Sequence, residues 1–278
     1  MQLVVFRIIC MTSVEREEVL YYGCDFLKEC GFYLKLDQNV ITTASILFQR
    51  FFRRRSIYKY SNVVCAGACL LLASKIEEDV RKVREVINVM YTCLCYREIW
   101  KDCFDTQTKK VVPLDYYGMF GEDVGYEWRT LMIEMERQVL HECGFNLGIE
   151  NHHKFILVYV NCLRERADAG DWVSQSGEKW RDMLQSAWNY GNDVLKSQIV
   201  VEVAVECIAC ACIHLAANDY DLCLPTRWYE VFGADVSDFQ QSLDGMRRVY
   251  EIAEQGVVFR DVANLGIKRL FVPMKESC

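Results

Sequence analysis

The chain has 278 residues, of which 52% are hydrophobic and 26% are charged, with a formal net charge of −7 and a pI near 5.3. These fractions are normal for a globular protein and exclude disorder over most of the length. The acidic balance argues against nucleic acid as the primary partner, because duplex-binding domains usually present a basic face.

The sequence also argues against a membrane partner. No apolar run approaches the ~20 residues that a membrane-spanning helix needs. The apolar opening MQLVVFRIIC lacks a basic start and a small-residue cleavage site, so we do not expect a signal peptide.

Composition and periodicity both favour helices. Three prolines and fifteen glycines are few for an all-β chain, which needs frequent turns. Apolar residues instead recur every three or four positions, the period of an amphipathic helix. In chain order, the first half is predicted to contain helices near residues 13–30, 37–51, 62–77, 81–91 and 128–143. The third of these is apolar almost all round through CAGACLLLA, so we expect it to be the central, buried helix of a bundle.

The second half repeats this plan. VCAGACLLLAS, starting at Val64, matches CIACACIHLAA, starting at Cys207, in small and apolar character at an offset of 143 residues. The same offset places ILFQRFF, at 46–52, over NYGNDVL, at 189–195, which match only by their place in the plan. One offset shared by two segments indicates a duplicated helical unit.

We therefore predict an all-α fold of two tandem five-helix units, each built around a buried central helix. The predicted order is an N-terminal extension (1–12), the first unit (13–147), the second unit (148–265) and a C-terminal tail (266–278). Within the first unit the periodic pattern breaks at about 92–126, which predicts a long insert. An exposed connection is predicted at 165–178.

Several of the fifteen cysteines lie inside apolar helical runs, where free cysteine behaves as a small core residue. These are Cys65, Cys69, Cys207, Cys210 and Cys212. Cys207 and Cys210 form a C-x-x-C pair, but no second pair or suitably spaced histidine completes a zinc site. We therefore expect buried thiols, no metal and a reducing, intracellular location.

Two charged side chains stand beside apolar helical runs. Lys75 follows the buried third helix directly, and its ammonium could simply cap that helix, where the dipole favours a cation. Glu136 lies in the fifth helix and could simply be a solvated carboxylate. If the two instead meet on one surface, they form a donor–acceptor pair able to hold the backbone of another protein. The predicted apolar stripe of the fifth helix consists of Leu131, Met132, Met135, Val139 and Leu140.

These segments resemble a known family. LLLASKIEE, ending at Glu78, resembles the signature of the cyclin box, and MERQVLHECGFNL, starting at Met135, is similar to the fifth-helix segment of that family. LFQRFF, KIEEDVRKVREVINV, AWNYGNDVL, IACACIHLAA and LPTRWYEVFGA are similar to the L-type cyclins, near the K and T types that serve transcription. The resemblance covers roughly Ser13 to Tyr250.

The cyclin resemblance implies a non-catalytic regulator that binds a cyclin-dependent kinase and holds the kinase αC helix in its active position. It implies no cofactor, a nuclear location, a role in transcription or RNA processing, and a monomer in the absence of kinase. Carried onto this sequence, the family pattern implies kinase binding by Lys75, Ile76, Glu77, Glu78, Glu136, Leu140, Phe145 and Leu147.

Two features of the family are missing from the sequence. The stretch SVEREEVL, at 13–20, lacks the M-R-A-I-L type patch with which some cyclins recruit substrates. The Arg/Ser-rich tail typical of L-type cyclins does not appear before Cys278. We therefore do not predict an association with splicing factors.

The strongest basic cluster has two interpretations. It could be a solvated helix end and loop, or it could bind a phosphorylated peptide or RNA, since clustered arginines suit phosphate geometry. The cluster consists of Arg50, Arg53, Arg54, Arg55 and Lys59. For the adjacent His152 and His153 we expect an ordinary capping or surface role.

Two rival functions remain open at this stage. A transcription factor of the TFIIB type shares the duplicated helical fold but predicts a basic second unit and a zinc ribbon, neither of which the sequence contains. A helical scaffold or enzyme without a kinase partner is the other rival. An enzyme is not expected, because the sequence has no G-x-x-x-x-G-K-[ST] loop, no kinase H-R-D and no convincing triad.

Overall fold

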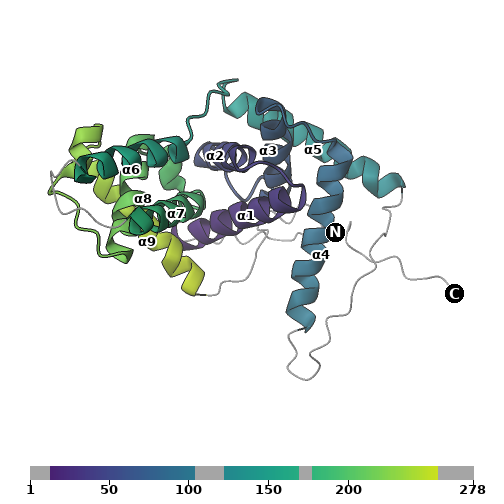
Figure 1. The fold of residues 1–278 in the computed structure, drawn as a ribbon. Helices are drawn as coiled ribbons and strands as arrows, with labels where there is room; N and C mark the ends of the chain where they lie inside the picture. Colours follow the sequence, from purple (N-terminus) through teal and green to yellow (C-terminus); the bar gives the residue numbers. More distant parts are fainter. Residues whose placement is uncertain (1–12, 104–121, 169–176, 256–278) are drawn as a thin grey trace.

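The computed structural model describes residues 13–103, 122–168 and 177–255, and these residues form α-helices and short 3-10 helices without a strand (Figure 1). The all-α fold predicted from the sequence is therefore confirmed. The predicted N-terminal extension and C-terminal tail lie outside the described residues.

The first repeat contains five α-helices. They are α1 (Ser13–Tyr33), α2 (Gln38–Arg54), α3 (Asn62–Ile76), α4 (Val83–Cys103) and α5 (Glu122–Glu142). The first helix was predicted to end near residue 30 but continues to Tyr33. Gly31 does not end it and instead serves helix packing, since a Cβ there would lie 2.7 Å from Cγ1 of Ile41 on α2.

The predicted insert at 92–126 is helical at both of its ends, since α4 continues to Cys103 and α5 begins at Glu122. Thr92 stays helical, with its hydroxyl donating to the carbonyl of Asn88 (2.9 Å), a local bond that a helix tolerates. The remainder of that prediction, at 104–121, lies outside the described residues.

The second repeat follows the same order. Its elements are α6 (His152–Asp168), α7 (Gly177–Val194), η1 (Gln198–Val201), α8 (Val205–Asp219), η2 (Trp228–Phe232) and α9 (Val236–Glu254). The described part of this repeat has four α-helices rather than the predicted five, because the short η2 occupies the place of α4. The helices α3 and α8 are each 15 residues long and lie 143 residues apart, as predicted.

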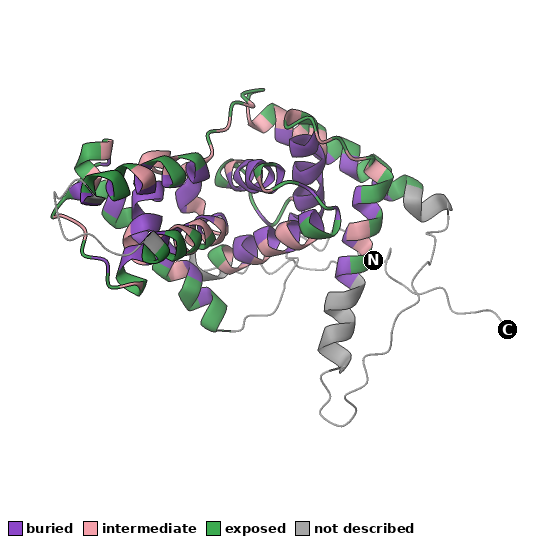
Figure 2. Cartoon of the chain, viewed as in Figure 1, coloured by how far each residue is buried: buried purple, intermediate pink, exposed green. Residues whose placement is uncertain are grey.

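The helix α3 is the centre of the first repeat, and Figure 2 shows it buried along its length. Every residue from Asn62 to Ser74 is buried, and α3 packs against α1, α2, α4 and α5. A Cβ at Gly67 would lie 2.1 Å from the Sδ of Met90 on α4 and 2.9 Å from the Cε of Met132 on α5. Glycine at this position therefore lets two helices approach α3 closely. In the second repeat, α8 packs in the same way against α6, α7 and α9.

The cysteines of the two central helices are free and buried, as predicted. Burial raises the pKa of the Cys210 and Cys212 thiols, so these groups stay protonated and behave as core residues. The full set comprises Cys65, Cys69, Cys207, Cys210 and Cys212. Within the described ranges, no group of three histidine, cysteine or acidic side chains could hold a metal ion.

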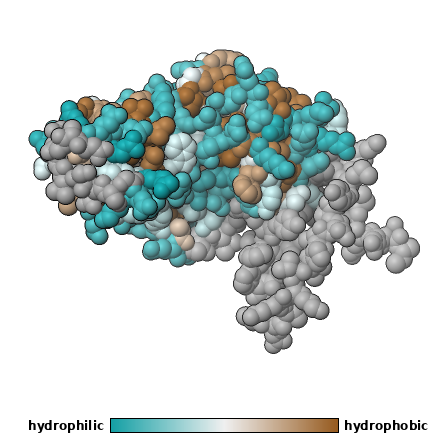
Figure 3. All heavy atoms as spheres, viewed as in Figure 1, coloured by the Kyte–Doolittle hydropathy of each residue, from teal (hydrophilic) through white to brown (hydrophobic). Residues whose placement is uncertain are grey.

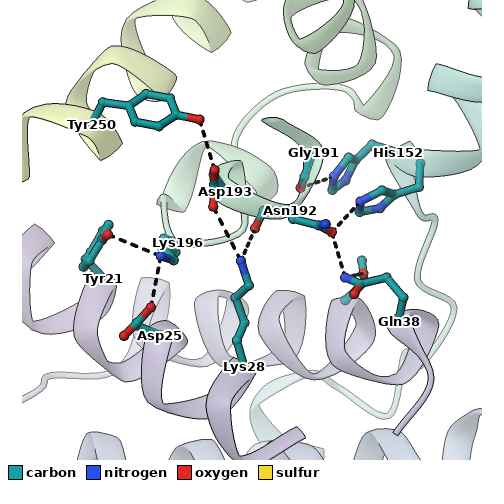
Figure 4. A network of polar contacts seen from close by, with 12 residues as sticks. Tyr21, Asp25, Lys28, Gln38, His152, Gly191, Asn192, Asp193, Lys196 and Tyr250 are labelled. Carbon is teal, nitrogen blue, oxygen red and sulfur yellow. Dashed lines mark hydrogen bonds and ion pairs between the residues drawn. The ribbon is translucent and has the colours of Figure 1, made fainter. Parts of the chain in front are cut away.

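The two repeats meet at the end of α7 through polar contacts (Figure 4). Lys28 on α1 donates to the backbone carbonyl of Asn192 (2.9 Å) and lies 3.6 Å from the carboxylate of Asp193. Gln38 on α2 donates to the side-chain oxygen of Asn192 (2.8 Å). From α9, the Tyr250 hydroxyl donates to Asp193 (3.0 Å). Helices from both repeats therefore converge on two consecutive residues.

Two histidines lie beside this contact. His152 and His153 begin α6, are buried and stack with ring centroids 4.4 Å apart. The His152 ring bonds to the Gly191 carbonyl (2.7 Å), and the His153 ring lies 2.9 Å from the side-chain oxygen of Asn192. Burial lowers the pKa of His152 to about 3 and that of His153 to about 4. The expected surface role is therefore wrong, because both rings are buried and neutral beside the contact between the repeats.

Candidate functional site

Lys75 and Glu136 come from two helices that pack against each other. Lys75 lies in the last turn of α3, Glu136 lies in α5, and the ammonium of Lys75 donates to Oε1 of Glu136. The Lys75 side chain is 45% exposed and that of Glu136 is 12% exposed. The structure thus brings the two charged groups together at the surface, where their remaining hydrogen-bonding capacity can face another molecule.

The residues that follow Lys75 form a fixed turn. Ile76, the last residue of α3, is partly buried and packs against the core. Glu77 closes the helix with its backbone N–H, and its carboxylate accepts a hydrogen bond from the hydroxyl of Thr43 on α2 (2.6 Å). Glu78 is exposed in the left-handed region (φ 61°), which is uncommon for a residue other than glycine. Both glutamates are therefore at the protein surface, and Glu77 is held in place by α2.

The end of α5 carries several apolar side chains. The N–H of Phe145 donates to the carbonyl of Leu140 (3.1 Å), and that of Gly144 donates to the carbonyl of His141 (3.0 Å), which is the bond pattern of a Schellman motif. Leu140 and Leu147 are partly buried against the core, whereas Phe145 is 70% exposed. Figure 3 shows hydrophobic residues among hydrophilic ones around α5. Charged and apolar groups thus occur together on this part of the molecule.

Three of the five residues of the basic cluster bond to other parts of the protein. Arg54 donates to the backbone carbonyl of Glu142 (2.6 Å), Arg55 pairs with the Glu142 carboxylate, and Arg53 donates to the carbonyl of Val201. These carbonyls belong to the ends of α5 and η1, where backbone acceptors lack helical partners. The three arginines therefore hold helix ends, although their side chains are exposed.

The comparison with protein families decides the identity of the chain. Residues 9–148 match the sequence model of the cyclin N-terminal domain. The chain belongs to the cyclin family. Among its curated relatives, Cyclin-L2 of Mus musculus is 36% identical over 225 residues, and Cyclin-L1 of Homo sapiens is 33% identical over 250 residues. The similarity to L-type cyclins that the motifs predicted is therefore confirmed.

This cyclin covers only part of those relatives. The first alignment includes 79% of this chain and 38% of Cyclin-L2, and the second includes 87% of this chain and 43% of Cyclin-L1. The chain thus spans about two fifths of the length of the curated relatives it matches.

Solved structures show the same fold. A chain in the crystal structure of the yeast RNA Pol II CTD kinase CTDK-1 complex matches with a TM-score of 0.59 at 15% identity, covering 89% of this cyclin and 78% of that chain. A viral cyclin from herpesvirus saimiri matches with a TM-score of 0.53 at 14% identity, covering 87% of each chain. At these identities the similarity establishes the two-repeat cyclin fold alone.

The structure adds Ile133 to the exposed surface of α5 and corrects the predicted stripe of this helix. Leu131, assigned to the buried stripe, is exposed, while Trp128 is buried. Ile133, which the sequence reasoning missed, is exposed three residues before Glu136 and therefore lies on the same side of the helix. Ile133 could have been recognised in the sequence as an apolar residue that does not belong to the predicted stripe. The role of Thr43 in holding Glu77 had no signal in the sequence.

None of the helices within the described ranges combines the length and the apolar character that crossing a bilayer requires.

Proposed function

We propose that this cyclin is a non-catalytic regulatory subunit that binds and activates a cyclin-dependent kinase. The binding surface consists of the Lys75–Glu136 pair and the apolar and acidic side chains around it, namely Ile76, Glu77, Glu78, Leu140, Phe145 and Leu147. The observation that carries this proposal is the meeting of Lys75 and Glu136 on two packed helices. An ammonium can donate hydrogen bonds to the backbone carbonyls of a partner helix end, and a carboxylate beside it can accept hydrogen bonds from backbone N–H groups.

Activation follows from selective binding. A kinase is active when a lysine on its strand β3 pairs with a glutamate on its αC helix. A partner that binds only the inward position of αC shifts the population toward the active state by its difference in affinity for the two states. A shift from 1:99 to 99:1 needs about 5.5 kcal/mol of such preference.

The apolar side chains must supply most of that preference. An exposed ion pair contributes only about 1 kcal/mol or less, whereas burying an apolar side chain contributes about 1.5–3 kcal/mol. Phe145 and Ile133 are exposed in the free cyclin and gain the most from being covered. The charged pair then fixes the orientation of the kinase, and the apolar residues provide the affinity.

The cellular role proposed is transcription or RNA processing in the nucleus, with the cyclin monomeric until it binds the kinase. This part rests on the similarity to Cyclin-L1 and Cyclin-L2. A structurally similar chain is also part of the yeast RNA Pol II CTD kinase CTDK-1 complex.

The test is affinity capture from cell extract followed by mass spectrometry. The unaltered cyclin should retain a cyclin-dependent kinase, and the Lys75→Ala/Glu136→Ala variant should retain about tenfold less, because hydrogen bonds to charged groups are lost. The matched control is Asp244→Ala/Arg247→Ala, which removes an exposed ion pair of 3.0 Å on α9. Equal recovery of the kinase by all three proteins would refute the proposed surface, and recovery of no kinase by any would refute the function.

A further inference from the structure

Ser56 lies directly after three arginines in an exposed segment. The side chains of Arg53 and Arg54, at the end of α2, and of Arg55 and Ser56, which follow it, are all exposed, in a chain whose net charge is −7. Arg55 has already left the helix and adopts an extended backbone (φ −114°, ψ 149°). The Ser56 hydroxyl accepts a long hydrogen bond from the backbone N–H of Tyr58 (3.3 Å). A hydroxyl in this position is accessible to an enzyme that selects basic sequences.

The contacts of the arginines argue against an external phosphate ligand. Arg53, Arg54 and Arg55 all bond to groups at the ends of η1 or α5, so an incoming peptide or RNA must displace these bonds. A phosphate attached to Ser56 is different, because the chain itself holds it beside Arg55 at a high effective concentration.

We propose that Ser56 is a phosphorylation site for an arginine-directed protein kinase, and that the phosphate on Ser56 takes Arg55 away from Glu142. The co-reactant is ATP. The Ser56 Oγ attacks the γ-phosphorus, the bond from that phosphorus to the β,γ-bridging oxygen breaks, and ADP leaves. The hydroxyl proton passes to the catalytic aspartate of the modifying kinase.

Charge and position explain why Arg55 changes partner. A phosphoserine carries about −1.5 to −2 charges at pH 7 and offers three acceptor oxygens, so it binds a guanidinium more strongly than one carboxylate does. Glu142 is the last residue of α5, where the helix dipole disfavours a negative charge, and Arg55 now compensates for it. Loss of this partner leaves the Glu142 side chain, which is 10% exposed, with the His141 ring nitrogen 3.6 Å from its carboxylate.

The expected result is a looser end of α5. Glu136 lies on the same helix, so phosphorylation of Ser56 would act on one edge of the proposed kinase-binding surface. This last consequence alone rests on the proposed function, whereas the modification and the exchange of partners by Arg55 do not.

The modification is tested by incubating the full chain with MgATP and the catalytic subunit of cAMP-dependent protein kinase, followed by intact-mass and peptide mass spectrometry. One phosphate should appear on the peptide that contains Ser56, and Ser56→Ala should abolish it. Arg54→Gln should slow its addition about tenfold, because the modifying enzyme loses charge-assisted bonds. The matched control is Ser237→Ala, since Ser237 is exposed but bonds to Asp235 (2.6 Å). Equal labelling of Ser56→Ala and the unaltered protein would overturn the site.

The exchange of partners is tested by amide hydrogen exchange on the phosphorylated and unmodified proteins. The amides at 140–147 should exchange about three- to tenfold faster after phosphorylation, because a surface ion pair anchors this helix end only modestly. Glu142→Gln should give the same increase without phosphate. Unchanged exchange in the phosphorylated protein, with faster exchange in Glu142→Gln, would show that Arg55 stays with Glu142. Neither readout depends on a cyclin-dependent kinase.

Discussion

Acidification should weaken the contact between the two repeats, because His152 and His153 are buried there as neutral rings. Their folded-state pKa values are about 3 and about 4, whereas histidine in an unfolded chain has a pKa near 6.5. Between these values the unfolded chain binds protons that the folded chain does not. The contribution to stability is therefore fully present above about pH 6.5 and is lost progressively as the pH falls toward the folded values.

The size of the effect follows from those values. At pH 5.5, an unfolded histidine is about ten parts protonated to one part neutral, while a folded ring with a pKa of about 4 is almost entirely neutral. Each site then lowers the free energy of unfolding by about 1.4 kcal/mol, and the pair lowers it by about 3 kcal/mol. Burial is the main cause of the low pKa of His153, the hydrogen bond to Asn192 opposes it, and the nearby ammonium of Lys28 adds to it.

The assay is urea unfolding at pH 7.5 and pH 5.5, combined with NMR titration of the histidine rings. His153→Gln is the control, since glutamine can still hydrogen-bond to Asn192 but takes up no proton in this range. The variant should lose about half as much stability as the unaltered protein over the same pH interval. Titration of the His152 and His153 rings near pH 6.5 in the folded protein would refute the reasoning.

Three further outcomes are expected. Gly67→Ala should lower the free energy of unfolding by about 1–3 kcal/mol through overpacking, while Gly148→Ala, whose Cβ would meet nothing closer than 3.5 Å, should change it little; equal thermal unfolding midpoints would contradict this. Ser61→Ala should cost about 1 kcal/mol, since the Ser61 side chain caps α3, as urea unfolding can check. Among the described cysteines, the exposed Cys162 and Cys223 should react with iodoacetamide in the native protein, and rapid alkylation of the α3 thiols would contradict the buried core.

The sequence predicted the central helices best. The third predicted helix, at 62–77, differs from α3 by one residue, because an uninterrupted apolar run leaves little choice of boundary. The prediction was wrong for α4. Polar and aromatic residues after Thr92 were interpreted as the end of the helical pattern, although the helix continues to Cys103. Helix ends set by packing, as at Gly31, had no distinct signal either, because the same residue type both ends helices and permits close contact.

The candidate site could be predicted only in part. Lys75 and Glu136 are 61 positions apart in the chain, so their meeting depends on how α3 crosses α5, which periodicity does not determine. The same limit applies to the buried histidines, since the partner of His153 on α7 is 39 positions away. Local patterns identify which side chains are unusual, whereas the tertiary arrangement determines what they contact.

The side-chain oxygen of Asn192 bonds to Gln38 from the first repeat and lies 2.9 Å from the His153 ring of the second. One atom thus satisfies polar groups from both halves of the molecule. A polypeptide cut near Gly148 would leave Gln38 and Lys28 in one fragment without their acceptors and would expose the paired imidazoles of the other to water. The two repeats are consequently not interchangeable. Transfer of either repeat into another protein would require replacement of the residues that form the polar contact between them.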